Sequence, residues 1–249
     1  SRQTINQSIA DQTNQMIPEL LPKDSIKPTT VSVLTNAIYF KGDWQSPFDS
    51  SSDAEFYKLD GSKINTKLMY QKGYFGYSED KQAQVIALPY KGEALSMLVI
   101  LPKSKDKAAM DRLVKGLTPT QMDQWSSKLE KQEAIVRLPK FTLDAGYKMK
   151  PLLSNLGMPR AFEKTGEFKM FGNDLDRDLV IDEVYHKAVI KVDEVGSEAA
   201  AATGIVGIFT GGPVNLTPPV EFNADHPFMF VIKDNKTGAI LFLGQVNEP

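Results

Sequence analysis

The chain has 249 residues, enough for one large domain or two small ones, and its 41% hydrophobic and 24% charged residues are typical of a globular protein. Its net charge of -2 provides no general attraction for nucleic acid or an anionic membrane surface, and no apolar run reaches membrane-spanning length. The absence of cysteine excludes disulfides and thiol chemistry.

The N-terminal half combines one helical pattern with long apolar runs. Apolar side chains recur every three or four positions over residues 3–21 and predict an amphipathic helix. Residues 29–41 form a nearly continuous apolar run, which predicts a strand covered on both faces. The runs 84–90 and 94–102 flank a Lys-Gly pair and predict a buried hairpin.

The C-terminal half continues this mixture. Thr118 is expected to cap a helix, and residues 134–141 form another strand. A helix over 149–158 is expected to end at Gly157, and residues 179–195 are too long and β-branched a run for anything but an extended strand. The runs 227–234 and 239–246, joined by Asn-Lys-Thr-Gly, predict a second hairpin. The pattern indicates one α+β domain that is rich in long strands.

Residues that carry chemistry are few. The two histidines are His186 and His226. His186 lies within a strand and is expected to be a hydrogen-bonded core residue, whereas His226, before Pro227 at the start of a strand, is expected to have a capping or turn role. Neither a G-x-S-x-G elbow, nor a glycine-rich phosphate loop, nor a metal-ligand spacing occurs. We therefore expect no catalytic residue, metal or cofactor, and a hydrolase is disfavoured.

Two polar patterns remain weak. Lys103, Lys105 and Lys107 are expected to lie in a solvated loop, with a polyanion site as the lesser alternative. Three glycosylation sequons, close to the number expected by chance, would matter only in a eukaryotic secreted protein. They begin at Asn6, Asn215 and Asn235.

The segment DEVGSEAAAATGIVGIFTGG, residues 193–212, is the least ordinary stretch. Four alanines favour a helix, yet they follow a strand and lead into glycines. Read as a strand, the segment presents small uncharged side chains at alternate positions from Ser197 to Thr203, after a flexible Gly196. This pattern suits a strand that must enter a packed sheet. An exposed polyalanine helix or surface loop fits the local pattern equally well.

Five motifs resemble the serpin family and occur in the family's order. They are NAIYFKGDWQSPFD (36–49), LPYKGEALSMLVILP (88–102), RLPKFTLDAGYKMKPLLSNLGM (137–158), VYHKAVIKVDEVGSEAAAAT (184–203) and the closing DHPFMFVIKDNKTGAILFLGQVNEP (225–249). The resemblance implies a serpin fold, with a large mixed β-sheet, further sheets and surrounding helices. It also implies a single domain over 1–249 that lacks the family's N-terminal helices and some sheet strands, with a reactive-centre loop at about 194–219.

The resemblance further implies a suicide inhibitor of serine proteases. A protease cleaves the loop, forms an acyl-enzyme ester and is trapped when the freed loop inserts into the metastable main sheet. The hinge of this conformational change would consist of Glu194, Gly196, Ser197, Glu198, Ala199, Ala200, Ala201, Ala202 and Thr203. Asn36 and His186 would be buried polar partners under the sheet, and Trp44 would pack where the loop enters.

The family's spacing places the reactive bond about fourteen residues beyond Gly196, at Thr210–Gly211. A shift of one residue would present Phe209, and any bond from Ile208 to Val214 lies within the variation of the family. Thr210 suits elastase- or subtilisin-like proteases and Phe209 a chymotrypsin-like one. The loop contains neither Arg nor Lys, which disfavours trypsin-like targets.

Because the family's early elements have no counterpart here, we expect the strands 29–41 and 178–195 to lack a neighbour and to expose apolar surface. The missing N-terminal part, as a separate chain, is then a candidate partner. The resemblance also implies an extracellular or secreted location, although the polar N-terminus contains no signal peptide. The alternative function is a non-inhibitory serpin-like binding protein or chaperone, or an inactive fragment whose loop is only a substrate.

Overall fold

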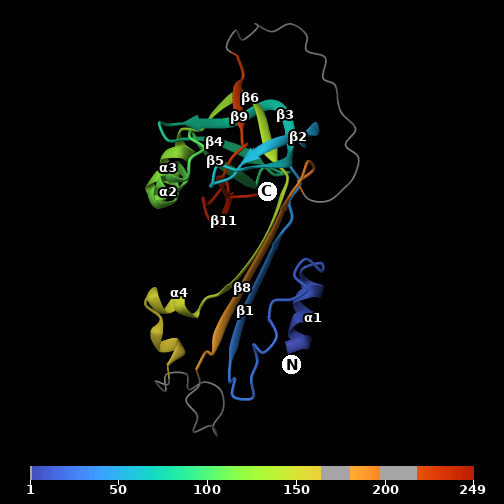
Figure 1. Ribbon diagram of the computed structural model, residues 1–249, viewed down its shortest axis with the longest axis vertical. Coiled ribbons are helices and arrows are strands. Elements are labelled where there is room, and N and C mark those ends of the chain that lie inside the picture. Colours follow the sequence, from blue (N-terminus) through green and yellow to red (C-terminus); the bar gives the residue numbers. More distant parts are fainter. Residues whose placement is uncertain (1, 164–179, 197–217) are drawn as a thin grey trace. The chain divides into compact units, whose positions relative to one another are not determined.

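The computed structural model describes residues 2–163, 180–196 and 218–249 (Figure 1). The chain divides into two compact units, the first made of Ser1–Phe40 and Leu143–Ile190 and the second of Lys41–Thr142 and Lys191–Pro249. The single domain over 1–249 stays a prediction, because one fold can contain more than one compact unit.

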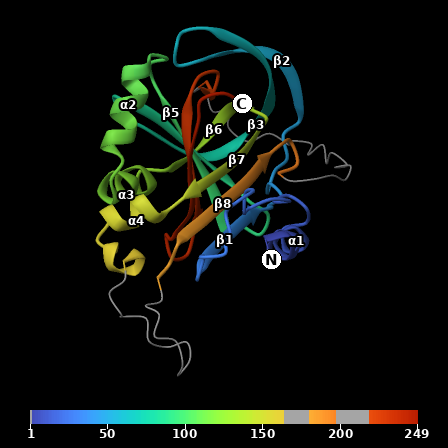
Figure 2. The ribbon, with the colours of Figure 1, turned by 60° about the horizontal axis from the view of Figure 1, so that its bottom comes forward.

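The first unit is built on a three-stranded sheet with the order β1-β8-β7 (Figure 2). Strand β1 spans Val33–Phe40, β8 spans Glu183–Val192 and β7 spans Phe141–Lys148. β1 and β8 are parallel and remain in register from Val33 opposite Glu183 to Phe40 opposite Ile190. The short helices α4 (Lys150–Asn155) and η1 (Pro159–Phe162) follow β7.

The N-terminal helix is shorter than the apolar pattern predicts. Helix α1 spans Arg2–Gln12, and Asn14 and Gln15 have positive φ angles of 50° and 62°. The segment beyond them returns along the helix, since the Asn6 amide donates to the Leu21 carbonyl and accepts from the Leu21 N–H, each over 2.9 Å. Pro18 in that segment lacks the N–H that a helix interior needs. The helical spacing beyond Gln12 therefore comes from an irregular segment packed on the sheet.

That segment supplies the core of the first unit. Ile17, Leu20 and Leu21 pack against Tyr185 and Val189 of β8, and all five are buried. Residues at odd positions of β8 therefore face α1 and the segment after it. Residues at even positions, His186 among them, face the opposite side of the sheet.

The second unit contains an eight-stranded sheet with the order β11-β10-β5-β4-β3-β6-β9, in which β2 pairs with β3. Its strands are β2 (Ser50–Tyr57), β3 (Lys63–Glu79), β4 (Ala83–Pro89), β5 (Leu95–Pro102), β6 (Glu130–Pro139), β9 (Val220–Asn223), β10 (Phe228–Asp234) and β11 (Ile240–Val246). Both predicted hairpins, β4–β5 and β10–β11, are confirmed as antiparallel pairs.

Two helices cover one face of this sheet. Helix α2 spans Lys107–Gly116 and α3 spans Pro119–Ser127. Their side chains Met110, Leu113 and Trp125 pack with residues of β4, β5 and β10 in one buried cluster. The Thr118 cap is confirmed, because its hydroxyl accepts the N–H of Gln121 over 3.2 Å.

Lys103 and Lys105 lie in the exposed loop that the charges predict, but Lys107 begins helix α2. Asp106 caps α2 by accepting the Ala109 N–H over 2.7 Å, and Met110 and Leu113 are buried beneath it. The three lysines each form an ion pair, with nitrogen–oxygen distances of 2.6–2.8 Å. The pairs are Lys103–Glu79, Lys105–Asp225 and Lys107–Asp111. Since each ammonium group already has a carboxylate, the polyanion alternative loses its support.

Strand exposure departs from expectation in two ways. β1 is not covered on both faces, and Leu34 is 48% exposed, because within the described residues β8 is its single pairing partner. β8 does not lack a neighbour, since it lies between β1 and β7. Of the two strands that were expected to lack a neighbour, only β1 is an edge strand of the described sheet.

Candidate functional site

Trp44 fixes the chain that leaves β8. The indole is 3% exposed, stacks on Tyr90 with ring centroids 4.6 Å apart, and donates from Nε1 to the Asp193 carbonyl over 2.9 Å. Its backbone N–H donates to the Val195 carbonyl, also over 2.9 Å. The sequence motif that contains Trp44 thus holds the residues directly before the alanine run.

Gly196 ends this fixed segment in a conformation that other residues rarely adopt. Its φ is +113°, and a Cβ built there would lie 2.5 Å from the backbone nitrogen of Trp44. The Asp193 carboxylate accepts the N–H groups of Val195 and Gly196, both over 3.1 Å. Tight packing as well as a turn therefore requires glycine at this position.

Glu194 adds an ion pair to the same joint. Its Oε1 lies 2.6 Å from Lys140 Nζ, and its carbonyl accepts the N–H of Phe48 over 2.8 Å. Burial acts to raise the pKa of Glu194, but hydrogen bonds from Lys140 and Ser51 hold the pKa below its ordinary value. The carboxylate is therefore charged at neutral pH and links the end of β6 to the segment after β8.

The structure brings Asn36 and His186 together. They are register partners across β1 and β8, and His186 Nδ1 lies 2.9 Å from Asn36 Oδ1. Tyr147 of β7 stacks on the imidazole with ring centroids 6.2 Å apart. The expected burial is wrong for this chain, because Asn36 is exposed and His186 is partly exposed.

Most of the predicted loop lies outside the described residues. This applies to both residues of the reactive bond, to the alternative Phe209 and to the hinge beyond Gly196. The residues concerned are Ser197, Glu198, Ala199, Ala200, Ala201, Ala202, Thr203, Phe209, Thr210 and Gly211. The described chain supplies the two anchors of this segment, one ending at Gly196 and the other beginning at residue 218.

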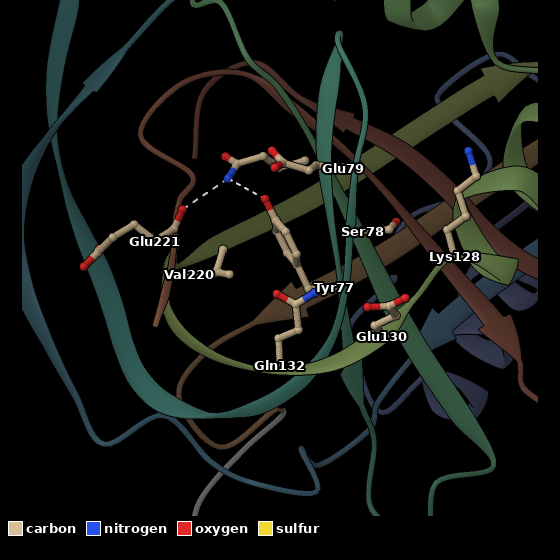
Figure 3. Close-up of a pocket in the computed structure, with 9 residues that line it drawn as sticks. Tyr77, Ser78, Glu79, Lys128, Glu130, Gln132, Val220 and Glu221 are labelled. Atoms are coloured by element: carbon tan, nitrogen blue, oxygen red, sulfur yellow. Dashed lines mark hydrogen bonds between the residues drawn. The ribbon is translucent and has the colours of Figure 1, made fainter. Parts of the chain in front are cut away.

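The second anchor leads into β9, which pairs in parallel with β6. Val220 and Glu221 line a polar cavity of about 400 Å³ together with Tyr77 (Figure 3). The amide of Gln84 donates to the Tyr77 hydroxyl over 2.9 Å and to the Glu221 carbonyl over 3.2 Å. Burial raises the pKa of Tyr77, so its hydroxyl keeps its proton. These bonds attach β9 to β3 and β4.

His226 anchors the same region. The sequence did not predict its long-range contacts. It is 5% exposed, its Nδ1 lies 2.8 Å from Asp225 Oδ1, and its Nε2 lies 2.8 Å from the Pro102 carbonyl. Asp225 also binds Lys105. No short-range pattern could have found this link, because Pro102 is distant in sequence.

The described residues contain neither a metal-binding cluster nor a membrane-spanning helix. Among them, no group of three or more His, Cys, Asp or Glu side chains is arranged to hold a metal ion. The helices of this part of the chain are too short or too polar to cross a membrane.

Comparisons with known proteins agree on one family. The family model described as "Serpin (serine protease inhibitor)" matches residues 1–249. A leukocyte elastase inhibitor from Sus scrofa is 38% identical over 257 aligned residues, and Serpin B3 from Homo sapiens is 38% identical over 255. The alignments cover 100% of this chain but 66% and 64% of those relatives, so the chain spans just under two thirds of their length.

Solved structures agree with the sequence comparisons. The crystal structure of a thermophilic serpin, tengpin, in the native state matches with a TM-score of 0.86 and 29% identity. Uncleaved ovalbumin matches with a TM-score of 0.85 and 27% identity. These alignments cover 100% of this chain and 63% and 62% of those structures.

Proposed function

The chain belongs to the serpin family, and we propose that the protein inhibits serine proteases as a suicide substrate. The observation that carries this proposal is the joint at Glu194–Gly196. There β8, paired in parallel with β1, leads through a tightly held turn into a segment with small residues at alternate positions.

The strand directions permit insertion. A chain that turns back at Gly196 runs antiparallel to β8, and it also runs antiparallel to β1 because β1 and β8 are parallel. It would replace one ladder of backbone hydrogen bonds with two. Because its alternate side chains are small and uncharged, they can enter a packed sheet without the cost of burying a charge. Insertion must first separate Asn36 from His186, whose hydrogen bond crosses the same pair of strands.

The chemistry belongs to the attacking protease. Its serine Oγ attacks the Thr210 carbonyl, the Thr210–Gly211 amide bond breaks, and the new amino group of Gly211 takes up a proton. An ester then joins the protease to Thr210. Loop insertion would move the attached protease away from the position at which it first bound. This displacement would distort the protease active site before water hydrolyses the ester.

An elastase-like protease is the proposed target. Several relatives carry the name leukocyte elastase inhibitor, and Thr210 suits a small or medium specificity pocket. Subtilisin-like proteases suit the same residue, and a chymotrypsin-like protease would be the target if the bond followed Phe209. We place this activity outside the cell, as the family resemblance implies.

The missing N-terminal part is a further proposed partner. β1 offers an open edge, and β11 ends the larger sheet with Ile240, Leu241 and Leu243 about half exposed. About a third of the length of each relative lies outside the alignment with this chain. We propose that this additional chain, joined or separate, supplies strands and helices to these surfaces, and that trapping requires it.

The test is incubation with elastase, subtilisin and chymotrypsin, using the complete protein and the 249-residue chain in parallel. An adduct that survives SDS, with a released peptide beginning at Gly211, is expected for the complete protein. Ser197→Arg should convert inhibition into plain cleavage, because an arginine must enter the sheet, whereas the matched Ser197→Ala should retain the adduct. An unchanged adduct with Ser197→Arg would exclude insertion. Cleavage of the complete wild-type protein without an adduct would favour the non-inhibitory alternative.

A further inference from the structure

A cavity of about 380 Å³ lies between strands β7 and β8 and the segment that follows α1. The backbone bond from Met149 N–H to the Val184 carbonyl, 2.8 Å long, and the ion pair of Asp144 with Lys187 show that β7 and β8 run antiparallel. In that register Lys148 lies opposite Tyr185 and Gly146 opposite Lys187. All four residues line the cavity, and all face the α1 side of the sheet.

Gly146 keeps this space open. A Cβ built on it would meet no atom within 4 Å, and its φ is not in the left-handed region. The backbone therefore does not require glycine here, unlike at Gly196. The missing side chain instead leaves room beside the apolar surface of Leu20, Pro22 and the Tyr185 ring.

Some of the charged side chains at the cavity form ion pairs and others do not. Lys187 pairs with Asp144 over 3.0 Å, and Glu19 pairs with Arg2 over 2.7 Å. Lys148 has no carboxylate partner within the described part of the chain. Lys148 is exposed, so the cavity has at its rim one solvated ammonium group that can bind an anion.

Tyr185 supplies a second polar group. It is 7% exposed as a whole, but within the described residues its hydroxyl oxygen is not a buried unpaired atom, so the hydroxyl is open to solvent at the cavity. Burial and the nearby charge of Glu183 raise the pKa of Tyr185, so the hydroxyl remains a donor. The Glu183 carboxylate itself accepts the N–H groups of Lys150 and Val184, both over 3.0 Å.

We propose that this cavity binds a small carboxylate with a planar apolar body. The Lys148 ammonium group and the Tyr185 hydroxyl would bind the carboxylate, and the body would lie in the space beside Gly146 against Leu20 and Pro22. The cavity combines an apolar wall with convergent polar groups, and small-molecule sites use both to hold and orient a ligand. The inference is independent of the inhibitory function, since it requires neither the loop nor a protease.

The test is a calorimetric titration of the 249-residue chain with 2-naphthoate. We expect saturable binding at one site, and at least tenfold weaker binding of the neutral 2-naphthamide. Lys148→Met and Gly146→Leu should each weaken 2-naphthoate binding at least tenfold. Their matched controls on α2, Lys115→Met and Gly116→Leu, should bind as the wild type does.

The proposal is overturned if 2-naphthoate does not bind, if the amide binds equally well, or if both cavity variants retain wild-type affinity. Circular dichroism checks that each variant is folded. A second measurement uses the wild-type chain, and a variant is needed only to assign one NMR signal. In protein labelled with ¹³C at the tyrosine rings, 2-naphthoate should shift the Tyr185 signal, identified by its loss in Tyr185→Phe. An unmoved Tyr185 signal under saturating ligand also overturns the proposal.

Discussion

Gly196 shows how a single residue controls the start of the loop. Its positive φ and its contact with the backbone beside Trp44 leave no space for a side chain. The sequence identified this residue as a flexible hinge. In the structure it is held by the carboxylate of Asp193 and is buried. The glycine is needed for close packing, and the turn that it makes is fixed.

We therefore expect Gly196→Ala to destabilise the chain by about 2 kcal/mol or more, since strain at a positive φ adds to a backbone clash. Urea unfolding measures the change. Gly146→Ala is the control, because the new Cβ meets nothing there and β-strand backbone tolerates alanine. Equal stability of the two variants would show that the turn adjusts to a side chain.

Glu194 makes the stability of the joint depend on pH. Its pKa is below the ordinary value of 4.5 in the folded state, so the stabilisation is present above that value and is lost as the pH falls through the folded pKa. The side chain is 25% exposed, which limits the contribution to about 1 kcal/mol. Glu194→Gln should lower the unfolding free energy by that amount near neutral pH.

The difference between Glu194→Gln and the wild type should then shrink as the pH is lowered from about 5, because the wild-type carboxylate becomes protonated. Denaturant unfolding at a series of pH values measures it. A difference that stays constant down to acid pH would show that the ion pair with Lys140 is not its source.

At the scale of elements, local signals succeeded where they combined a cap or turn with an apolar run. The Thr118 cap, the two hairpins and the helix ended by Gly157 all depend on contacts within a few residues, and all four are present. Helix α2 was missed because its lysines outweighed the spacing of Met110 and Leu113. β9 was missed because it is short and is defined by its pairing with β6, a distant strand.

The cap on α3 gives an element-scale prediction. Thr118→Ala should destabilise the chain by about 1 kcal/mol, because the N–H of Gln121 loses its acceptor. Thr120 lies two residues further along and is exposed. Thr120→Ala should therefore be neutral or slightly stabilising, since alanine is the better helix former. Thermal unfolding of both variants tests this, and equal losses would contradict a capping role.

For the whole molecule, the exposed edges of the two sheets determine where the chain can associate with other chains. β4 and β5 lie in the middle of the larger sheet and are almost fully buried, whereas β1 ends the smaller sheet and is half exposed. Unpaired strand edges invite association with other chains. The exposed edge of β1 is therefore the place where the proposed additional chain would pair.

Hydrogen exchange of the 249-residue chain tests this difference. Amides of β1 that point away from β8 should exchange at least a hundredfold faster than those of β5, because they have no acceptor in the described sheet. Addition of the N-terminal part should slow the β1 amides and leave those of β5 unchanged. Protection of β1 that grows with protein concentration would indicate pairing between copies instead.

The family, the α+β class, the two hairpins and the positions of Asn36, His186, Trp44 and Gly196 could be predicted from sequence, because they follow from local propensity and from motifs with fixed spacing. The pairing of strands outside the hairpins could not be predicted, nor could the ion pair of Lys140 with Glu194, the link from His226 to Pro102 or the cavity at Gly146 and Lys148. The reason is physical. Such contacts join residues far apart in the chain, and their distances exist only after the strands have chosen their neighbours.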